Sequence, residues 1–154
     1  MPAPYRSIAC FVDGGPASRV VFDEARALRA QSPGELVVVH VIAEPLMLLS
    51  SPFASPPPTI YDERGAALEW LAEQIGDAAG VEAVLLSGWP PSAACDFAAS
   101  SGIDLLVAAA HRGIVDRAML GSFASHVAYH ATCPVLLVHP PSLSDASKGR
   151  AASG

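Results

Sequence analysis

Small, flexible and cationic residues gather in one stretch of the chain. Ala110-His111-Arg112-Gly113 is separated by seven residues from Gly121-Ser122. An apolar run precedes this stretch and a helix-like segment beginning at Phe123 follows it. Glycine lets the backbone approach an anion closely, and the first N–H groups of a helix can donate to it. The pattern is typical of a loop that holds phosphate groups, with Arg112 and Arg117 supplying positive charge.

Ser122 has two interpretations at the start of that helix. Its hydroxyl can cap the helix, and it can also donate to a phosphate. A purely structural cap is as consistent with the sequence as a binding role, so both remain open.

Asp13 follows the first expected strand and precedes Gly14-Gly15. A carboxylate there can accept hydrogen bonds from a ribose or an adenine edge, or bind a metal. The alternative is a turn-forming aspartate. Residues 13–18 also faintly resemble the SGGxDS loop of ATP-using synthetases, but they lack the leading serine and the second aspartate. A synthetase-like enzyme is therefore a distant third possibility.

The histidines do not predict a metal site. His126 and His130 are spaced i,i+4 on an expected helix, as metal ligands can be. No glutamate follows the first histidine, so the HExxH pattern fails, and no third ligand is evident. A polar helix face is the better interpretation. His40 lies within an apolar strand and is expected to be a hydrogen-bonded core residue. We nominate no catalytic residue and no metal ligand.

The composition of the 154-residue chain excludes several functions. The single lysine, Lys148, lies near the end of the sequence, which excludes a Walker-type loop and Schiff-base catalysis in the fold. A formal net charge of −6 disfavours nucleic-acid binding. The three cysteines lack CxxC spacing and are expected to be reduced core thiols of a cytoplasmic protein. No signal peptide and no membrane-spanning apolar run is expected.

Apolar strand patterns alternate with helical ones along the chain. Strands are expected at residues 6–12, 35–42, 81–86, 104–109 and 134–138, and helices at 17–31, 60–79, 92–100 and 122–132. Ser92 is the expected cap of the third helix. This order predicts an α/β fold: an open five-stranded parallel sheet with helices on both faces, Rossmann-like in architecture. Residues 5–140 are expected to form one domain, and 141–154 a flexible tail.

Parallel sheets bind ligands beyond the carboxyl ends of their strands. Asp13, the residues after Val41 and the loop from Ala110 to Gly121 all lie at such ends, so we expect them to meet in one crevice. Residues 44–59 are expected to form a loop. Its apolar part, Leu46 to Leu49, is expected to cover the crevice or a dimer surface, because an exposed apolar patch of that size is unfavourable.

The chain from Arg6 to His139 resembles a universal stress protein domain. The matching pieces keep the family's order and spacing, although none is diagnostic alone. They are the first strand with the turn 13–18, the strand 36–41, Ser87-Gly88 before a proline, Asp104 to Val107, His111-Arg112-Gly113, Leu120-Gly121-Ser122, and Cys133 to Val138.

The resemblance implies the family's fold, which is adenine nucleotide alpha hydrolase-like, and its ATP-binding motif, Gly-x2-Gly-x9-Gly-Ser/Thr. Carried over by position, Asp13 would face the adenosine and the Val41 backbone would meet adenine. The ribose and phosphates would be held by Arg112, Gly113, Gly121, Ser122 and the amide of Phe123. ATP, with Mg²⁺ or Mn²⁺, is the implied ligand.

Two departures from the motif concern the phosphate end of the site. Ala110 stands where the motif has its first glycine, and the second spacer has seven residues instead of nine. If position 110 requires a positive φ, alanine there costs about 1 kcal/mol, and Ala110→Gly would leave nucleotide affinity unchanged or tighten it. The shorter spacer would draw the loop over the phosphates, and short spacers resemble the branch of the family that does not bind ATP.

The resemblance leaves two alternative functions open. One is a stress-response regulator that binds ATP or AMP and hydrolyses ATP slowly at most. The other is a dimeric interaction protein of the same fold that binds no nucleotide. In both, Pro134 to Val138 is expected at a sheet edge, where proline is tolerated and where a second copy can pair. The resemblance likewise implies a homodimer through this strand.

Overall fold

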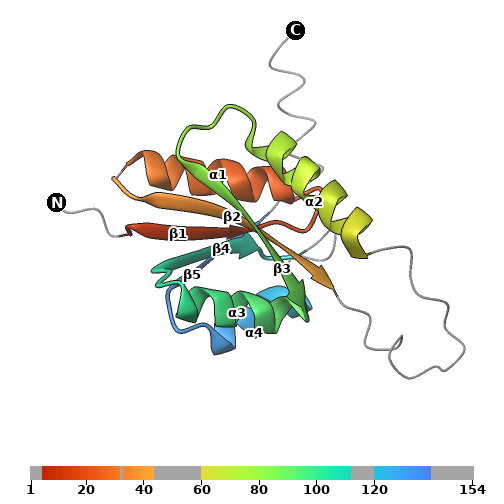
Figure 1. Ribbon diagram of the computed structural model, residues 1–154. Coiled ribbons are helices and arrows are strands. Elements are labelled where there is room, and N and C mark those ends of the chain that lie inside the picture. The colour runs from red at the N-terminus through yellow and green to blue at the C-terminus, as the bar shows by residue number, and fades with distance from the viewer. Residues whose placement is uncertain (1–4, 32, 44–59, 112–119, 140–154) are drawn as a thin grey trace, which may run out of the picture.

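The computed structural model describes residues 5–31, 33–43, 60–111 and 120–139. Strands and helices alternate throughout, which confirms the predicted α/β order (Figure 1). In chain order the elements are β1 (Ser7–Phe11), α1 (Ser18–Ala30), β2 (Glu35–Ala43), α2 (Ile60–Ile75), β3 (Val81–Gly88), α3 (Pro90–Ser100), β4 (Leu105–Ala109), α4 (Ser122–His130) and β5 (Val135–Val138).

The five strands form one parallel sheet in the order β3-β2-β1-β4-β5. The chain builds outward from β1 through β2 to β3, then crosses to the other side of β1 for β4 and β5. The direction of winding therefore reverses between β1 and β4, and this is where open parallel sheets place their ligand crevice. As predicted, the last strand lies at an edge, and its four residues are half-buried.

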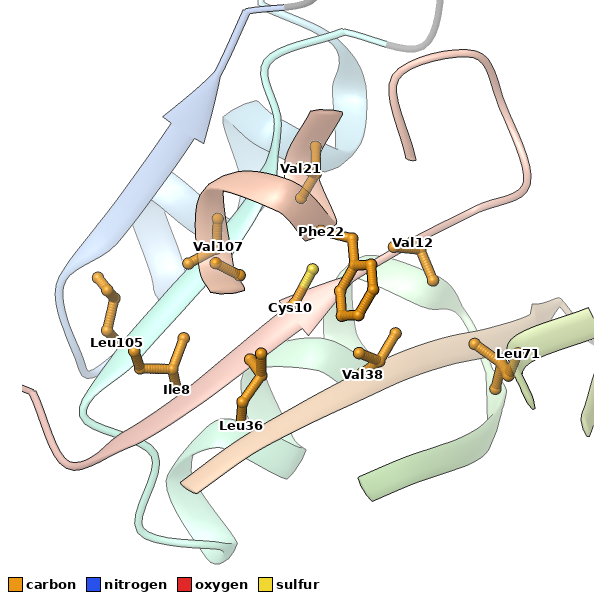
Figure 2. Packing of buried hydrophobic residues seen from close by; sticks show 11 residues of the cluster. Ile8, Cys10, Val12, Val21, Phe22, Leu36, Val38, Leu71, Leu105 and Val107 are labelled. Atoms are coloured by element: carbon orange, nitrogen blue, oxygen red, sulfur yellow. The ribbon is translucent and has the colours of Figure 1, made fainter. Parts of the chain in front are cut away.

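Side chains of the central strand alternate between two cores. Ile8, Cys10 and Val12 face α1 and α2, where they pack with Phe22 and neighbouring residues (Figure 2). Ala9 and Phe11 face α3 and α4. A strand buried on both faces must be apolar at every position, which explains the continuous apolar runs in the sequence.

Helix α1 shows how one element is fixed to the sheet. Its buried residues, Val21, Phe22 and Ala25, lie at helical spacing. On the exposed side, Arg19 forms an ion pair with Asp23, with 3.3 Å between nitrogen and oxygen. The helix ends next to Gln31, where Arg29 donates to the carbonyl of Gly34 at 3.1 Å.

Asp104 holds the start of β1 against β4. Its two carboxylate oxygens accept hydrogen bonds from the backbone N–H groups of Arg6, at 2.8 Å, and Ser7, at 3.0 Å. On the other side of β4, the carbonyl of Pro134 accepts from the N–H of Leu106 at 3.0 Å. These contacts fix the register of three adjacent strands at their amino ends.

Several predicted boundaries are wrong for local reasons. Helix α3 begins at Pro90 with Trp89 as its N-cap, so Ser92 is not the cap; proline fits the first turn because it has no N–H to satisfy there. Helix α2 ends at Ile75, not Ala79, because Gly76 adopts a φ of +56°. The expected apolar cover at Leu46 to Leu49 and the expected tail lie outside the described residues.

Among the described residues, no helix is long and apolar enough to cross a membrane. All three cysteines are free. Burial is the main influence on all three thiols and raises the pKa of Cys10, Cys95 and Cys133 above the usual value. None of them lines the cavity described below.

Candidate functional site

A cavity of about 890 Å³ lies at the carboxyl ends of β1, β2 and β4. Its remaining walls are the first turns of α1, α3 and α4. Every nominated residue that the structure describes lines it: Asp13, Val41, Ala110, Gly121, Ser122 and Phe123. The nominated Arg112 and Gly113 lie outside the described residues. The prediction that these strand ends converge is therefore confirmed for the described part of the set.

Asp13 organises the turn that joins β1 to α1. One oxygen of its carboxylate accepts from the Gly15 N–H at 2.8 Å and from the Ser18 hydroxyl at 3.3 Å. The Ser18 oxygen in turn accepts from the N–H groups of Asp13, at 3.2 Å, and Gly14, at 3.1 Å. The turn-forming interpretation is thus correct. Asp13 is nevertheless exposed and faces the cavity, so it can also meet a ligand.

Val41 presents a backbone edge that β1 does not cover. Residue 39, two positions earlier, is the last of β2 to pair with β1, and its carbonyl accepts from the Val12 N–H at 3.0 Å. Backbone groups of alternate strand residues point the same way, so the N–H and C=O of Val41 point past the end of β1. This is one donor and one acceptor in the plane of the sheet, the arrangement that the edge of a heterocyclic base can match.

Ala110 and Gly121 bring together the two ends of the loop that separates them. The Ala110 N–H donates to the Val138 carbonyl at 2.9 Å, and the Ala110 carbonyl accepts from the Gly121 N–H at 2.8 Å. Ala110 is fully buried, and no described residue other than glycine has a positive φ. The condition under which alanine would be strained at position 110 is therefore not met, because the backbone there has no positive φ and does not need glycine.

Helix α4 begins at the cavity with its first N–H groups unpaired inside the helix. Gly121 is the N-cap and, among the described residues, no side-chain hydrogen bond caps this helix, so of the two interpretations of Ser122 the capping one is not borne out. Ser122 is instead the first helical residue. The first bond within the helix runs from the Ser125 N–H to the Gly121 carbonyl, at 2.9 Å. The N–H groups of residues 122–124 therefore have no helical acceptor, and the positive end of the helix dipole faces the cavity.

Phe123 fixes the position of this helix start. Its ring packs against Phe11, with 6.0 Å between centroids, and so ties the first turn of α4 to the end of β1. The described lining residues include one carboxylate, Asp13, and no lysine or arginine. Within that lining, the groups suited to an anion are backbone N–H groups rather than charged side chains.

The three histidines that the sequence analysis considered as ligands or core residues, His40, His126 and His130, make contacts within the fold. As expected for a core histidine, His40 is partly buried and its Nδ1–H donates to the Val12 carbonyl at 2.8 Å. His126 and His130 lie with their ring centroids 4.3 Å apart, and the described residues contain no group of three metal-ligating side chains that includes them.

Trp89 lines the cavity although the sequence did not nominate it, and Pro90 and Pro91 continue the wall it begins. One signal could have identified it. An aromatic residue directly after Ser87-Gly88, at the carboxyl end of an expected strand, belongs to the edge where parallel sheets bind ligands.

Comparison with known proteins identifies relatives of the whole described domain. The sequence profile described as "Universal stress protein family" matches residues 4–139. A curated relative from Coxiella burnetii (strain RSA 493 / Nine Mile phase I), "Universal stress protein A homolog 1", is 30% identical over 139 residues, which cover 87% of this chain and 96% of the relative.

Two solved structures share the fold. A universal stress protein crystallised in complex with cAMP superposes with a TM-score of 0.66 at 23% identity, covering 90% of this chain and 99% of that one. An Arabidopsis thaliana universal stress protein family protein with AMP bound superposes with a TM-score of 0.59 at 18% identity, covering 88% of this chain and 92% of that one.

Proposed function

We propose that this chain, which belongs to the universal stress protein family, binds an adenine nucleotide in the cavity at the carboxyl ends of its strands. One observation carries the proposal. The same cavity of about 890 Å³ is lined by two sets of backbone hydrogen-bonding groups. One is the edge of Val41, which lies beyond the pairing of β2 with β1, and the other is the first turn of α4, whose N–H groups have no acceptor within the helix. That volume is typical of small-molecule sites.

The two sets of groups suit the two ends of a nucleotide. A base can pair in the sheet plane with the N–H and C=O of Val41, and a phosphate is stabilised at the amino end of a helix. Asp13 lies at the end of β1 between them in the strand order, where its carboxylate can accept from ribose hydroxyls. The solved relatives crystallised with cAMP and with AMP support the same ligand class.

ATP, with Mg²⁺ or Mn²⁺ on its phosphates, is the ligand that we propose first, and AMP the second. The role is that of a stress-response regulator, with ATP hydrolysis slow at most. We include pairing of two copies through the β5 edge in the proposal, because β5 ends the sheet with half-buried Val135 to Val138.

The sharpest test removes one backbone donor without breaking the helix. Ser122→Pro deletes the N–H of the first helical residue, where proline is well tolerated. Gly121 before it has φ −65° and ψ 162°, which a residue preceding proline can adopt. Ser122→Ala is the matched control, because it removes the hydroxyl and keeps the N–H.

Calorimetry with ATP and Mg²⁺, AMP and adenosine gives the readout. A hydrogen bond to a charged group contributes about 1.5–3 kcal/mol, so Ser122→Pro should weaken AMP and ATP roughly 10-fold or more relative to Ser122→Ala. Adenosine, which has no phosphate, should bind both variants equally. If the wild-type protein shows neither heat nor thermal protection at millimolar nucleotide, the proposal is wrong and a dimeric interaction protein replaces it.

A further inference from the structure

Trp89 differs from the other aromatic residues around the cavity in how much of its ring is open. It is 56% exposed and lines the cavity. Phe11 is buried, Phe123 packs on Phe11, and His40 is hydrogen-bonded to Val12. An exposed indole on a cavity wall leaves a large apolar surface in water, and this surface is available to a planar ligand.

The backbone around Trp89 is constrained on both sides. Gly88, the last residue of β3, has a φ of +129°, a conformation that L side chains rarely adopt. Trp89 is then the N-cap of α3, and Pro90 and Pro91 form the first turn. A residue that precedes proline is restricted to extended conformations, and Trp89 has φ −78° and ψ 116°, so the position from which the indole projects is defined before any ligand arrives.

The indole is also held from the side. The ring of His126 on α4 lies 4.8 Å from it, with an interplanar angle of 79°, in an edge-to-face contact. His126 in turn lies against His130, at 4.3 Å between centroids. Trp89 therefore connects the start of α3 to α4 across one wall of the cavity, and its ring loses little further freedom when a ligand stacks on it.

The sheet register places Trp89 at the base end of the proposed nucleotide site. Gly88 pairs with Ala43, the last residue of β2. Val41, whose backbone edge faces past β1, lies two residues before Ala43. Trp89 follows Gly88 directly and lines the same cavity as Val41, Ile42 and Ala43.

We propose that Trp89 is a specificity-determining residue that stacks on the base of the bound nucleotide and favours purines over pyrimidines. This inference rests on the proposed nucleotide function and adds to it. The backbone edge at Val41 offers one donor and one acceptor, which many bases can satisfy. Stacking area distinguishes a two-ring base from a one-ring base, because a larger π-face covers more of the indole.

The test measures the ratio of AMP to UMP affinity. Loss of a base-stacking aromatic ring weakens nucleotide binding, so Trp89→Leu should weaken AMP about 10-fold. UMP should weaken less, so the AMP-to-UMP preference falls. Trp89→Phe, which keeps a π-face, should retain most of the preference. A structural defect alone would lower both affinities together, and thermal unfolding of each variant verifies the fold.

A second measurement observes the ring directly. Trp70→Phe leaves Trp89 as the one tryptophan, since the chain has two, and Trp70 lies outside the cavity lining, against His40 at 5.4 Å. AMP should quench Trp89 fluorescence in this variant. Wild-type AMP binding with an unchanged ratio in Trp89→Leu, or without quenching, overturns the role of Trp89 and leaves the nucleotide function standing. Absence of all nucleotide binding by the wild-type protein overturns both.

Discussion

Ala110→Gly restores the glycine that the nucleotide-binding motif has at this position, and the structure indicates that it should damage the protein. Ala110 is 0% exposed and has no positive φ, so glycine relieves no strain there. The extra backbone freedom of glycine costs about 0.5–1 kcal/mol. Removal of a buried methyl group costs about 0.8 kcal/mol more.

The expected loss of unfolding free energy is therefore about 1.5 kcal/mol. For a chain of this length, that corresponds to a fall of about 3–6 °C in the unfolding midpoint. Differential scanning calorimetry on wild type and Ala110→Gly measures it directly. ATP affinity, corrected for the fraction folded, should stay the same, because both backbone hydrogen bonds of residue 110 are kept.

The matched control is Ala108→Gly. Ala108 lies in β4 and is 1% exposed, so it carries the same methyl and entropy costs away from the loop. Similar losses at both positions support regular backbone geometry at 110. A higher unfolding midpoint or tighter ATP binding in Ala110→Gly would refute the reasoning and restore the interpretation that alanine is strained there.

The remaining predictions concern assembly, thiol reactivity and strand register. Light scattering at micromolar concentration should return the mass of a dimer, paired through the β5 edge at Val135 to Val138; a particle of monomer mass contradicts this. Cys10 should resist iodoacetamide at pH 8 in the folded protein, because burial raises the pKa of its thiol and the reactive thiolate does not form. Mass spectrometry measures the rate of modification. If Cys10 in the folded protein reacts as fast as it does in urea-unfolded protein, this prediction is wrong. Asp104→Ala should destabilise the fold by about 1–2 kcal/mol in urea titrations, because it removes the acceptor for the N–H groups of Arg6 and Ser7. Asp104→Asn, which keeps one acceptor oxygen, should lose less, and equal stability of wild type and Asp104→Ala would show that these bonds are replaced by water.

The sequence predicted the fold well because burial on both faces of a parallel strand leaves a clear signal. The continuous apolar runs around Cys10, Val38 and Val107 are typical of strands buried on both faces of a sheet. The helical crossovers between successive strands indicate that the strands run parallel. The residues at which helices begin were harder to predict. Ser92 and Ser122 are both good capping residues by type, yet Trp89 and Gly121 are the N-caps, because proline and the preceding backbone decide where those helices start.

The position of the candidate site was predicted in outline because it follows from the strand order. The topology rule places Asp13, Val41 and Gly121 at strand ends, and the structure brings them to one cavity. The φ of Ala110 could not be predicted, since it depends on hydrogen bonds to residues 121 and 138, far along the chain. Trp89 was not nominated because its place in the proposed site depends on exposure, which residue type alone does not reveal.

The first turn of α4 has a consequence for how this protein can diverge. Its donors are main-chain N–H groups, and every residue type except proline carries one. Substitutions at 122–124 that preserve the helix therefore leave those donors in place, and side-chain changes there should be nearly neutral for the proposed anion binding. If the proposed anion site is used, selection acts on the path of the backbone, so two descendants of this chain can keep that site while sharing little sequence around it.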